Sequence, residues 1–333
     1  MAAIRTDRAD DYLPTGATLA FRFFAWTIVA TLFVFLANVY LKFWLGWPGP
    51  TAAFAGGGAL GWLQLLSYIG AVAAPAAFVV KTKGRSLRRD AEVMTGITAY
   101  IVRAAFWSVL LVGLADAVIS FLRVEGLLQG LVGQQLTQDL GRNQFRAPHV
   151  HLPLIGLSLI IAARSRTLGF TWLALLVVIA ELQIVVSRFV FSYEQAFMGD
   201  LVRFWYGGLF LFASAYTLIE EGHVRVDVLY AAFSSRTKGL VNALGSLVLG
   251  IPLCWVVLAI GFDQKSSIIA SPLLAFEVTQ AGFGMYVKYL LAAFLAIFAI
   301  TMMTQFSAYF LDGVADYRGD PGKREPEAET AAH

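Results

Sequence analysis

The sequence predicts an all-α integral membrane protein with about eight transmembrane helices, and two observations lead to this prediction. The mean hydropathy is +0.69 and only 14% of the residues are charged. Apolar stretches follow one another from Phe23 to Phe310, and no polar segment between them is long enough to fold separately. A soluble chain of 333 residues could not bury so much apolar surface in one core, whereas lipid acts as the solvent for a membrane protein. The spans should be helices because lipid offers no partner to unpaired backbone groups.

A helix of about 20 apolar residues crosses the hydrocarbon core of a bilayer. The predicted spans, in chain order, are Phe23–Leu41, Leu60–Val80, Ile97–Phe121, Val150–Ala163, Leu168–Phe191, Leu201–Ile219, Leu240–Ile260 and Tyr286–Phe310. The fourth span is short, so it either extends back through Pro148 and His149 or is re-entrant.

The distribution of Lys and Arg favours one orientation. If the N-terminus lies in the cytoplasm, the inner loops and tails hold fifteen of these residues and the outer loops hold eight. Cytoplasmic loops carry an excess of Lys and Arg, so we expect both ends of the chain inside. The densest basic run, Lys81–Arg89, is interpreted as a topology anchor that also attracts anionic membrane lipids.

Two segments outside the spans are expected to differ in kind. Within Leu122–Arg146, apolar residues recur at helical spacing with Gln and Asp between them. This pattern is typical of a helix that lies on the membrane surface or against a partner. Residues 313–333 become polar and include Pro, Glu and Ala, which favours a disordered cytoplasmic tail.

Glu181 is predicted to lie near the middle of its span, where a charge usually faces the interior of a helix bundle. It is either an ion or proton site or a hydrogen-bonded carboxylate that joins helices. Its partner would be Arg103, Gln183 or a residue of another subunit. Arg103 and Arg22 lie within spans but close to the inner face, so their guanidinium groups can extend to the interface.

Asp116 is a second acid predicted to lie within a span, and its surroundings resemble those of Glu181. The segments Leu110–Arg123 and Leu175–Arg188 each place Ala before the acid and an arginine seven positions after it. Seven residues are about two helical turns, so acid and base share a face roughly 10 Å apart, too far for a direct ion pair within one helix. The similarity is either chance or the trace of a duplicated helix.

Several functional classes find no support in the sequence. A net charge of +3 is too small to indicate a nucleic-acid partner. Cys254 is the only cysteine, which excludes an internal disulfide and a thiolate zinc cluster. The four histidines do not oppose one another within spans as haem ligation requires, and no phosphate-binding loop or zinc-binding helix occurs. We therefore expect no metal, no cofactor, no catalytic residues and no enzymatic activity.

The aromatic residues after the fifth span are expected to anchor a helix at the outer interface. They are Phe189, Phe191, Tyr193, Phe197, Phe204, Trp205 and Tyr206. The small residues that follow, from Gly207 to Ala215, leave room for another helix to come close.

The segment Ser187–Tyr230 carries the most specific pattern in the chain. Arg188 lies where the chain leaves the fifth span, and Asp200 and Arg203 follow as an acid and a base. The last element, Gly222–Asp227, has the sequence GHVRVD. This segment resembles the small membrane subunit, the DctQ-type or Q component, of tripartite ATP-independent periplasmic (TRAP) transporters.

The resemblance covers roughly residues 168–311. It departs from the family pattern at Phe197, where the family often has Trp, and at Gly199, which replaces an acid. It implies that the loop around GHVRVD is cytoplasmic and that the mixed charges there pair with another subunit. The partner-binding residues implied are Arg188, Asp200, Arg203, Glu220, Glu221, His223, Arg225 and Asp227.

The resemblance implies a small permease subunit, a static scaffold in a bacterial inner (cell) membrane, that supports ion-gradient-driven uptake of an organic acid. Its implied partners are a large M-type permease subunit and a periplasmic substrate-binding protein. Residues 1–165 are then an N-terminal membrane extension of about four spans, and residues 166–312 a DctQ-like four-helix domain. The alternatives are a membrane anchor or redox subunit of an enzyme complex, and a stand-alone secondary carrier with Glu181 as its ion site.

Overall fold

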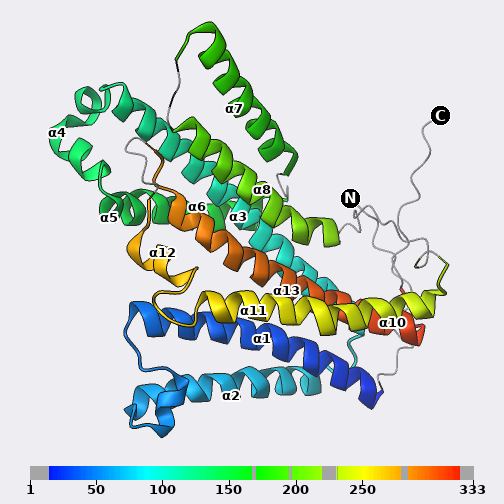
Figure 1. Cartoon of the computed structure of the whole chain (residues 1–333). Coiled ribbons are helices and arrows are strands. Elements are labelled where there is room, and N and C mark those ends of the chain that lie inside the picture. The colour runs from blue at the N-terminus through cyan, green and yellow to red at the C-terminus, as the bar shows by residue number, and fades with distance from the viewer. Residues whose placement is uncertain are drawn as a thin grey trace, which may run out of the picture. The chain divides into compact units, whose positions relative to one another are not determined.

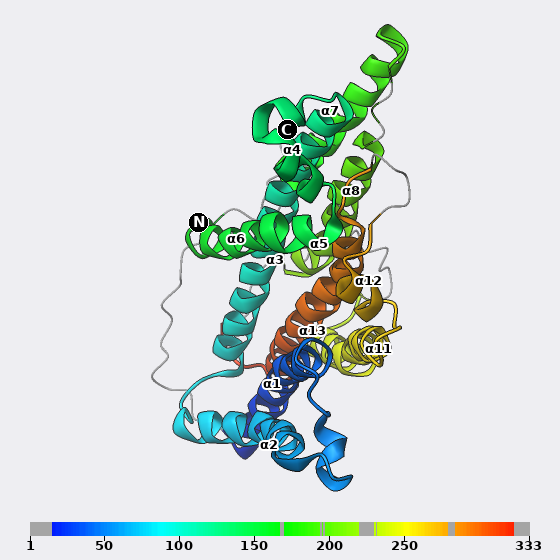
Figure 2. The ribbon, with the colours of Figure 1, turned by 90° about the vertical axis from the view of Figure 1, so that its left-hand side faces the viewer.

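The computed structural model describes residues 15–166, 170–193, 195, 197–219, 230, 232–278 and 284–322. These residues form helices joined by short connections, with no strand among them (Figures 1 and 2). Eight helical segments in the described residues are long and apolar enough to cross a membrane. The prediction of an all-helical, multi-pass membrane protein with about eight spans is confirmed, and its orientation stays a prediction.

The helices follow one another along the chain with short turns between most of them. Their bounds are α1 Gly16–Trp44, η2 Pro50–Phe54, α2 Gly58–Lys81, α3 Leu87–Val124, α4 Leu128–Leu140, α5 Asn143–Arg146, η3 Ala147–His151, α6 Leu152–Arg164, α7 Phe170–Val190, α8 Met198–Ile219, α10 Ser235–Gly245, η4 Ser246–Gly250, α11 Ile251–Gly261, α12 Ala270–Ala275 and α13 Lys288–Arg318. Here η2 is a 3₁₀ turn, and η3 and η4 are π turns that continue the helices on either side.

The fourth span is one continuous helix from α5 through η3 to α6, so it extends back through Pro148 and His149. Proline has no backbone N–H and its ring collides with the carbonyl one turn earlier in an α-helix. The wider π turn at Ala147–His151 contains Pro148, and Pro153 follows in the first turn of α6. A continuous helix of this length favours the extended span over the re-entrant alternative.

The segment predicted as a surface helix forms α4. Leu128 and Leu140 at its two ends are buried, whereas Leu131 and Leu136 are exposed. Gly133 has a φ of 81°, which breaks the helix into two short pieces. A residue with a side chain would be strained there, so glycine allows α4 to bend.

The chain divides into two compact units. Unit 1 comprises residues 1–97, 218–254 and 302–333, and unit 2 comprises residues 98–217 and 255–301. Each unit combines helices from the first 165 residues with helices from the rest of the chain. The proposed domain boundary at residue 165 stays a prediction.

In unit 1, glycines allow α10 and α13 to cross with their backbones in contact. A Cβ atom on Gly239 would lie 2.6 Å from the carbonyl oxygen of Gly313. A Cβ atom on Gly313 would in turn lie 2.8 Å from the carbonyl oxygen of Gly239. Such close approach between small residues is typical of helix pairs in membranes, where van der Waals contact drives association.

Arg22 of α1 is fully buried in unit 1, which corrects the expectation that it extends to the interface. Its Nε donates a hydrogen bond of 2.7 Å to Asp90, and its Nη1 donates one of 2.8 Å to the carbonyl oxygen of Thr82. Asp90 also accepts hydrogen bonds from Trp26 and Arg85. A nearby carboxylate inside the protein thus replaces water as the partner of this guanidinium group.

In unit 2, α8 packs closely on α3 and α13. A Cβ atom on Gly208 would lie 3.2 Å from the Val109 side chain, and one on Gly207 would lie 3.3 Å from Leu291. The small residues of α8 therefore allow close helix contacts, as the sequence predicts.

The aromatic residues before and within α8 divide into two groups, which corrects the expectation that all of them anchor the helix at an interface. Phe197, Phe204 and Trp205 are buried in the core of unit 2. Phe189, Phe191, Tyr193 and Tyr206 are exposed and remain suited to an interface.

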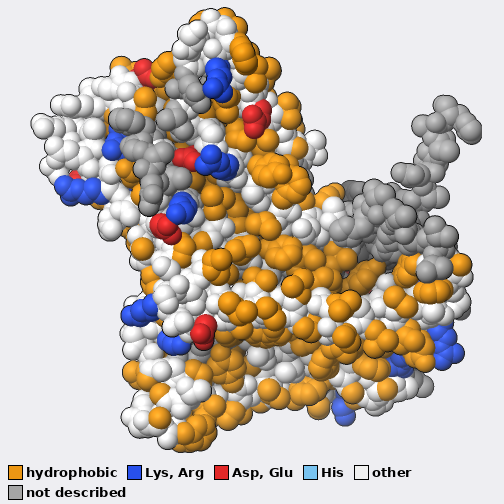
Figure 3. Space-filling model, viewed as in Figure 1, with side chains coloured by type: hydrophobic (Ala, Val, Ile, Leu, Met, Phe, Trp, Pro, Cys, Tyr) orange, Lys and Arg blue, Asp and Glu red, His pale blue; other side chains and the backbone are white. Residues whose placement is uncertain are grey.

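Large hydrophobic side chains are exposed along several of the spanning helices. Figure 3 shows hydrophobic side chains over α10 and α11, and the most exposed ones in this stretch are Val248, Leu249, Leu253, Val256 and Ile260. In a soluble protein such a surface would cause aggregation, whereas it suits a helix in contact with lipid.

Candidate functional site

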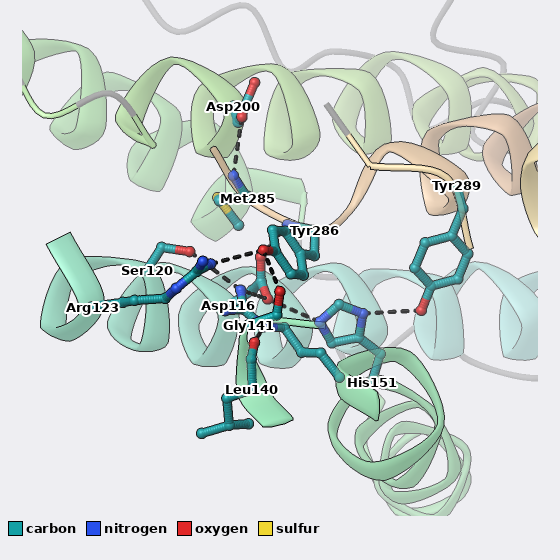
Figure 4. A network of polar contacts seen from close by, with 11 residues as sticks. Asp116, Ser120, Arg123, Leu140, Gly141, His151, Asp200, Met285, Tyr286 and Tyr289 are labelled. Atoms are coloured by element: carbon teal, nitrogen blue, oxygen red, sulfur yellow. Dashed lines mark hydrogen bonds and ion pairs between the residues drawn. The ribbon is translucent and has the colours of Figure 1, made fainter. Parts of the chain in front are cut away.

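A buried polar network centred on Asp116 of α3 is the most developed polar site among the described residues (Figure 4). One carboxylate oxygen of Asp116 accepts a hydrogen bond of 2.9 Å from Arg146 and lies 3.0 Å from Nε2 of His151. The other oxygen accepts a hydrogen bond of 2.7 Å from the backbone N–H of Tyr286. The side chains of Asp116, Arg146 and His151 are fully buried.

The π turn in the fourth span brings two of these groups to one face. Arg146 ends α5 and His151 ends η3, five residues later. In an α-helix, residues five apart point in different directions, whereas a π turn joins residues i and i+5 and aligns them. Both side chains therefore reach Asp116 from the same helix.

His151 connects the carboxylate to α13. Its Nδ1 lies 2.9 Å from the hydroxyl oxygen of Tyr289. Because an ionised carboxylate only accepts hydrogen bonds, Nε2 of His151 donates to Asp116. In the neutral imidazole Nδ1 then accepts a hydrogen bond from the hydroxyl of Tyr289.

Arg146 and Tyr286 extend the network further. The guanidinium carbon of Arg146 lies 4.0 Å from the centre of the Tyr286 ring, a cation–π contact. Nε of Arg146 donates to the carbonyl oxygen of Leu140. The hydroxyl of Tyr286 accepts a hydrogen bond of 2.7 Å from Arg123 and donates one of 2.8 Å to the carbonyl oxygen of Gly141.

Asp200 of α8 holds the backbone next to Tyr286. Its carboxylate accepts a hydrogen bond of 3.0 Å from the N–H of Met285. Two carboxylates on different helices thus bind two consecutive N–H groups just before α13 begins at Lys288. Negative charge near the start of a helix is favourable because the N-terminal N–H groups carry partial positive charge.

This network is suited to a structural role, which is to hold the helices in one arrangement. The carboxylate of Asp116 is already used by a guanidinium group, an imidazole and a backbone N–H. Buried polar groups that pair with one another fix one arrangement of the helices, and in this network Nη2 of Arg146 is the atom left without a hydrogen-bond partner among the described residues. Asp116 and Arg123 are expected to be too far apart on α3 for a direct ion pair. The structure agrees, because Asp116 forms its ion pair with Arg146.

Glu181, by contrast, is exposed on α7, and no described residue forms a hydrogen bond or ion pair with it. Neither of the two partners expected within the chain, Arg103 and Gln183, forms a hydrogen bond or ion pair with Glu181. Nε of Arg103 donates instead to the carbonyl oxygen of Ala162, at 3.3 Å. Whether Glu181 is an ion site or a carboxylate that joins helices therefore depends on groups other than the described residues.

Three of the other predicted partner-binding residues, Arg188, Asp200 and Arg203, lie in the described part of the chain. Arg188 lies in the last turn of α7 and is exposed. Arg203 of α8 is also exposed, and its guanidinium group lies 3.3 Å from the carboxylate of Asp200. Glu220, Glu221, His223, Arg225 and Asp227 lie outside the described residues. No cluster of at least three His, Cys, Asp or Glu side chains able to hold a metal ion occurs in the described part of the chain.

The connection that follows α7 is tied to the end of α3. The hydroxyl of Tyr193 donates a hydrogen bond to the carboxylate of Glu125. This hydrogen bond stabilises the protonated hydroxyl and so raises the pKa of Tyr193 above its ordinary value, and the negative charge of Glu125 acts in the same direction.

Sequence reasoning missed Arg146, His151, Tyr286 and Tyr289 as parts of the site. The sequence pattern places Arg146 at the end of the segment Leu122–Arg146, outside the spans, and relates the histidines only to haem ligation. A usable signal existed, because an acid within a span requires a partner at the same depth. Only the π turn, which the sequence pattern did not reveal, aligns both partners on one helix.

Comparison with known families finds a match in the second half of the chain. Residues 174–314 match the family model described as "Tripartite ATP-independent periplasmic transporters, DctQ component". The matched region begins in α7 and ends in α13, and the first four spans precede it. No curated protein and no solved structure is significantly similar to the chain.

Proposed function

We propose that the chain is the small permease subunit of a TRAP transporter, because residues 174–314 match the model of the DctQ component of these transporters. In this role it binds a large permease subunit, which carries the transport site, and works with a periplasmic substrate-binding protein. The family match is the single observation that carries the proposal. The transported substrate is an organic acid, and an ion gradient drives its uptake.

Within this complex the chain acts as a static scaffold. The Asp116 network supports this role, because its charges are paired within the chain and hold α3, the fourth span and α13 together. Such mutual pairing favours one rigid arrangement over an open ion path. The first four spans add membrane-embedded surface to the scaffold.

The proposed location is a bacterial inner membrane, with both ends of the chain in the cytoplasm. The excess of Lys and Arg on one side supports this orientation. Lys81, Lys83, Arg85, Arg88 and Arg89 would then contact anionic lipids of the inner leaflet.

Co-expression with a large TRAP permease subunit tests the proposal. We expect the two proteins to co-purify in detergent as a stable complex. Purification of the chain without the large subunit, under conditions in which both are inserted in the membrane, would contradict the proposed function.

The loop at Gly222–Asp227 is proposed to bind the large subunit on the cytoplasmic side. Arg225→Glu should reduce co-purification of the large subunit, because the planar guanidinium group can bind a carboxylate in a bidentate way. Arg225→Lys should have an intermediate effect. The measured quantity is the ratio of large to small subunit after affinity purification.

The control for this loop is Arg236→Glu, a basic residue at the start of α10 whose guanidinium group packs on the ring of Tyr317 within the chain. An exposed charge pair contributes less than about 1 kcal/mol, so a large effect at Arg225 requires a buried contact. If Arg225→Glu leaves the subunit ratio at the wild-type level, the loop does not bind the large subunit.

A further inference from the structure

The surface of α7 is apolar, and the other described residues of unit 2 leave most of it uncovered. Leu173 and Ala180 are its buried hydrophobic residues. They are seven residues apart, so they mark a single line along which α7 touches the other described helices. Figure 1 shows α7 inclined to α3 and α8 and not packed along them. The exposed large residues of the helix are Trp172, Leu175, Val178, Ile179, Leu182, Val185, Val186, Phe189 and Val190.

Glu181 interrupts this apolar surface. It lies about 100° around the helix from the line of Leu173 and Ala180. Among the described residues it is the one exposed charged side chain that lies more than two turns from both ends of its helix. Arg188, seven residues later on the same face, lies at the end of the helix, where a long side chain can reach the interface.

Contact with lipid alone explains the apolar residues of α7 but not Glu181. The exposed residues of α2, such as Leu66 and Ile69, show what a lipid-facing surface needs, since no charged residue interrupts them between Gly58 and Val80. A carboxyl group at mid-depth requires a hydrogen-bond donor, and lipid tails supply none. No described residue supplies this donor, which points to a donor on another protein chain.

We propose that the face of α7 formed by Val178, Glu181 and Val185 binds a transmembrane helix of the large permease subunit, which donates a hydrogen bond to Glu181 near the middle of the membrane. These residues lie at positions i−3, i and i+4 and form one stripe. The partner helix carries a basic, amide or hydroxyl side chain at that depth. This inference rests on the proposed function, and it assigns the contact to a helix that begins the DctQ domain.

Photo-crosslinking in the complex with the large subunit tests this contact. A photoreactive phenylalanine analogue is placed at Val178 or Val185, and at Leu66 or Ile69 of α2 as matched exposed controls. The α2 positions lie outside the region that matches the family. We expect crosslinks to the large subunit from the two α7 positions and not from the two α2 positions.

Substitutions of Glu181 give a second readout. Glu181→Leu should lower the amount of co-purified large subunit about threefold, the loss expected for one hydrogen bond between membrane helices. Glu181→Gln should keep most of it, because an amide still offers an acceptor. The same substitutions should leave the amount of membrane-inserted chain unchanged.

Each other outcome overturns the inference. If the complex forms but the α7 positions crosslink only to lipid or to a second copy of this chain, the large subunit binds elsewhere and the proposed function survives. If Glu181→Leu leaves the subunit ratio unchanged, Glu181 makes no contact with the large subunit. If no complex forms with the wild-type chain, the proposed function fails together with this inference.

Discussion

Asp116→Leu is expected to lower the free energy of unfolding of the purified protein by about 3 kcal/mol, the lower end of the range for breaking a buried ion pair. Without the carboxylate, the guanidinium group of Arg146, the Nε2–H of His151 and the backbone N–H of Tyr286 lose their acceptor. All three groups come from segments that Asp116 now holds together. The free energy can be measured by titrating mixed micelles with SDS and following tryptophan fluorescence.

Two further variants show whether the loss of stability in Asp116→Leu comes from the buried ion pair or from the removal of any acidic side chain. Asp139→Leu removes the partner of the exposed Arg142 and should lower the free energy of unfolding by less than about 1 kcal/mol. The double variant Asp116→Leu/Arg146→Met should recover part of the loss, because no uncompensated guanidinium group remains. Equal effects of Asp116→Leu and Asp139→Leu would show that the network does not hold the helices.

Asp90→Leu should lower the free energy of unfolding by a comparable amount, about 3 kcal/mol, through unit 1. Asp90 accepts hydrogen bonds of 2.7 Å from Arg22, 2.9 Å from Trp26 and 2.8 Å from Arg85. Arg22 is fully buried, so it would keep only its contacts with Thr82. The measurement is the same SDS titration.

Glu92→Leu is the matched control for Asp90. Glu92 lies two residues later on α3 and is exposed, so its loss should change the free energy of unfolding by no more than about 0.5 kcal/mol. If Asp90→Leu is as mild as Glu92→Leu, water must reach Arg22 and the pair does not stabilise unit 1.

The spans could be predicted from the sequence because their signal is local. A run of about 20 apolar residues has one low-energy arrangement in a bilayer, whatever it packs against. All eight predicted spans correspond to helices of the structure, and the helices mostly run on beyond the apolar stretch. For example, α13 continues to Arg318, eight residues beyond the predicted end at Phe310.

The partners of the intramembrane charges could not be predicted, because they depend on contacts between distant segments. Asp116 and Glu181 have similar sequence surroundings, with Ala before the acid and Arg seven positions later. Nevertheless, Asp116 is fully buried against Arg146 and His151, whereas Glu181 is exposed on α7. The sequence pattern determines the face of the helix on which an acid lies. Tertiary packing determines which residues, if any, contact that face.

Uptake into liposomes tests the central claim, that this chain is a scaffold subunit of a TRAP transporter, most directly. Liposomes are prepared with the chain alone, with the large permease subunit alone and with both, and the periplasmic binding protein is added outside with a radiolabelled organic acid that it binds. Under an inward sodium gradient, we predict uptake when this chain, the large subunit and the binding protein are all present, and none with this chain alone. Gradient-driven uptake by this chain without the large subunit would contradict the account.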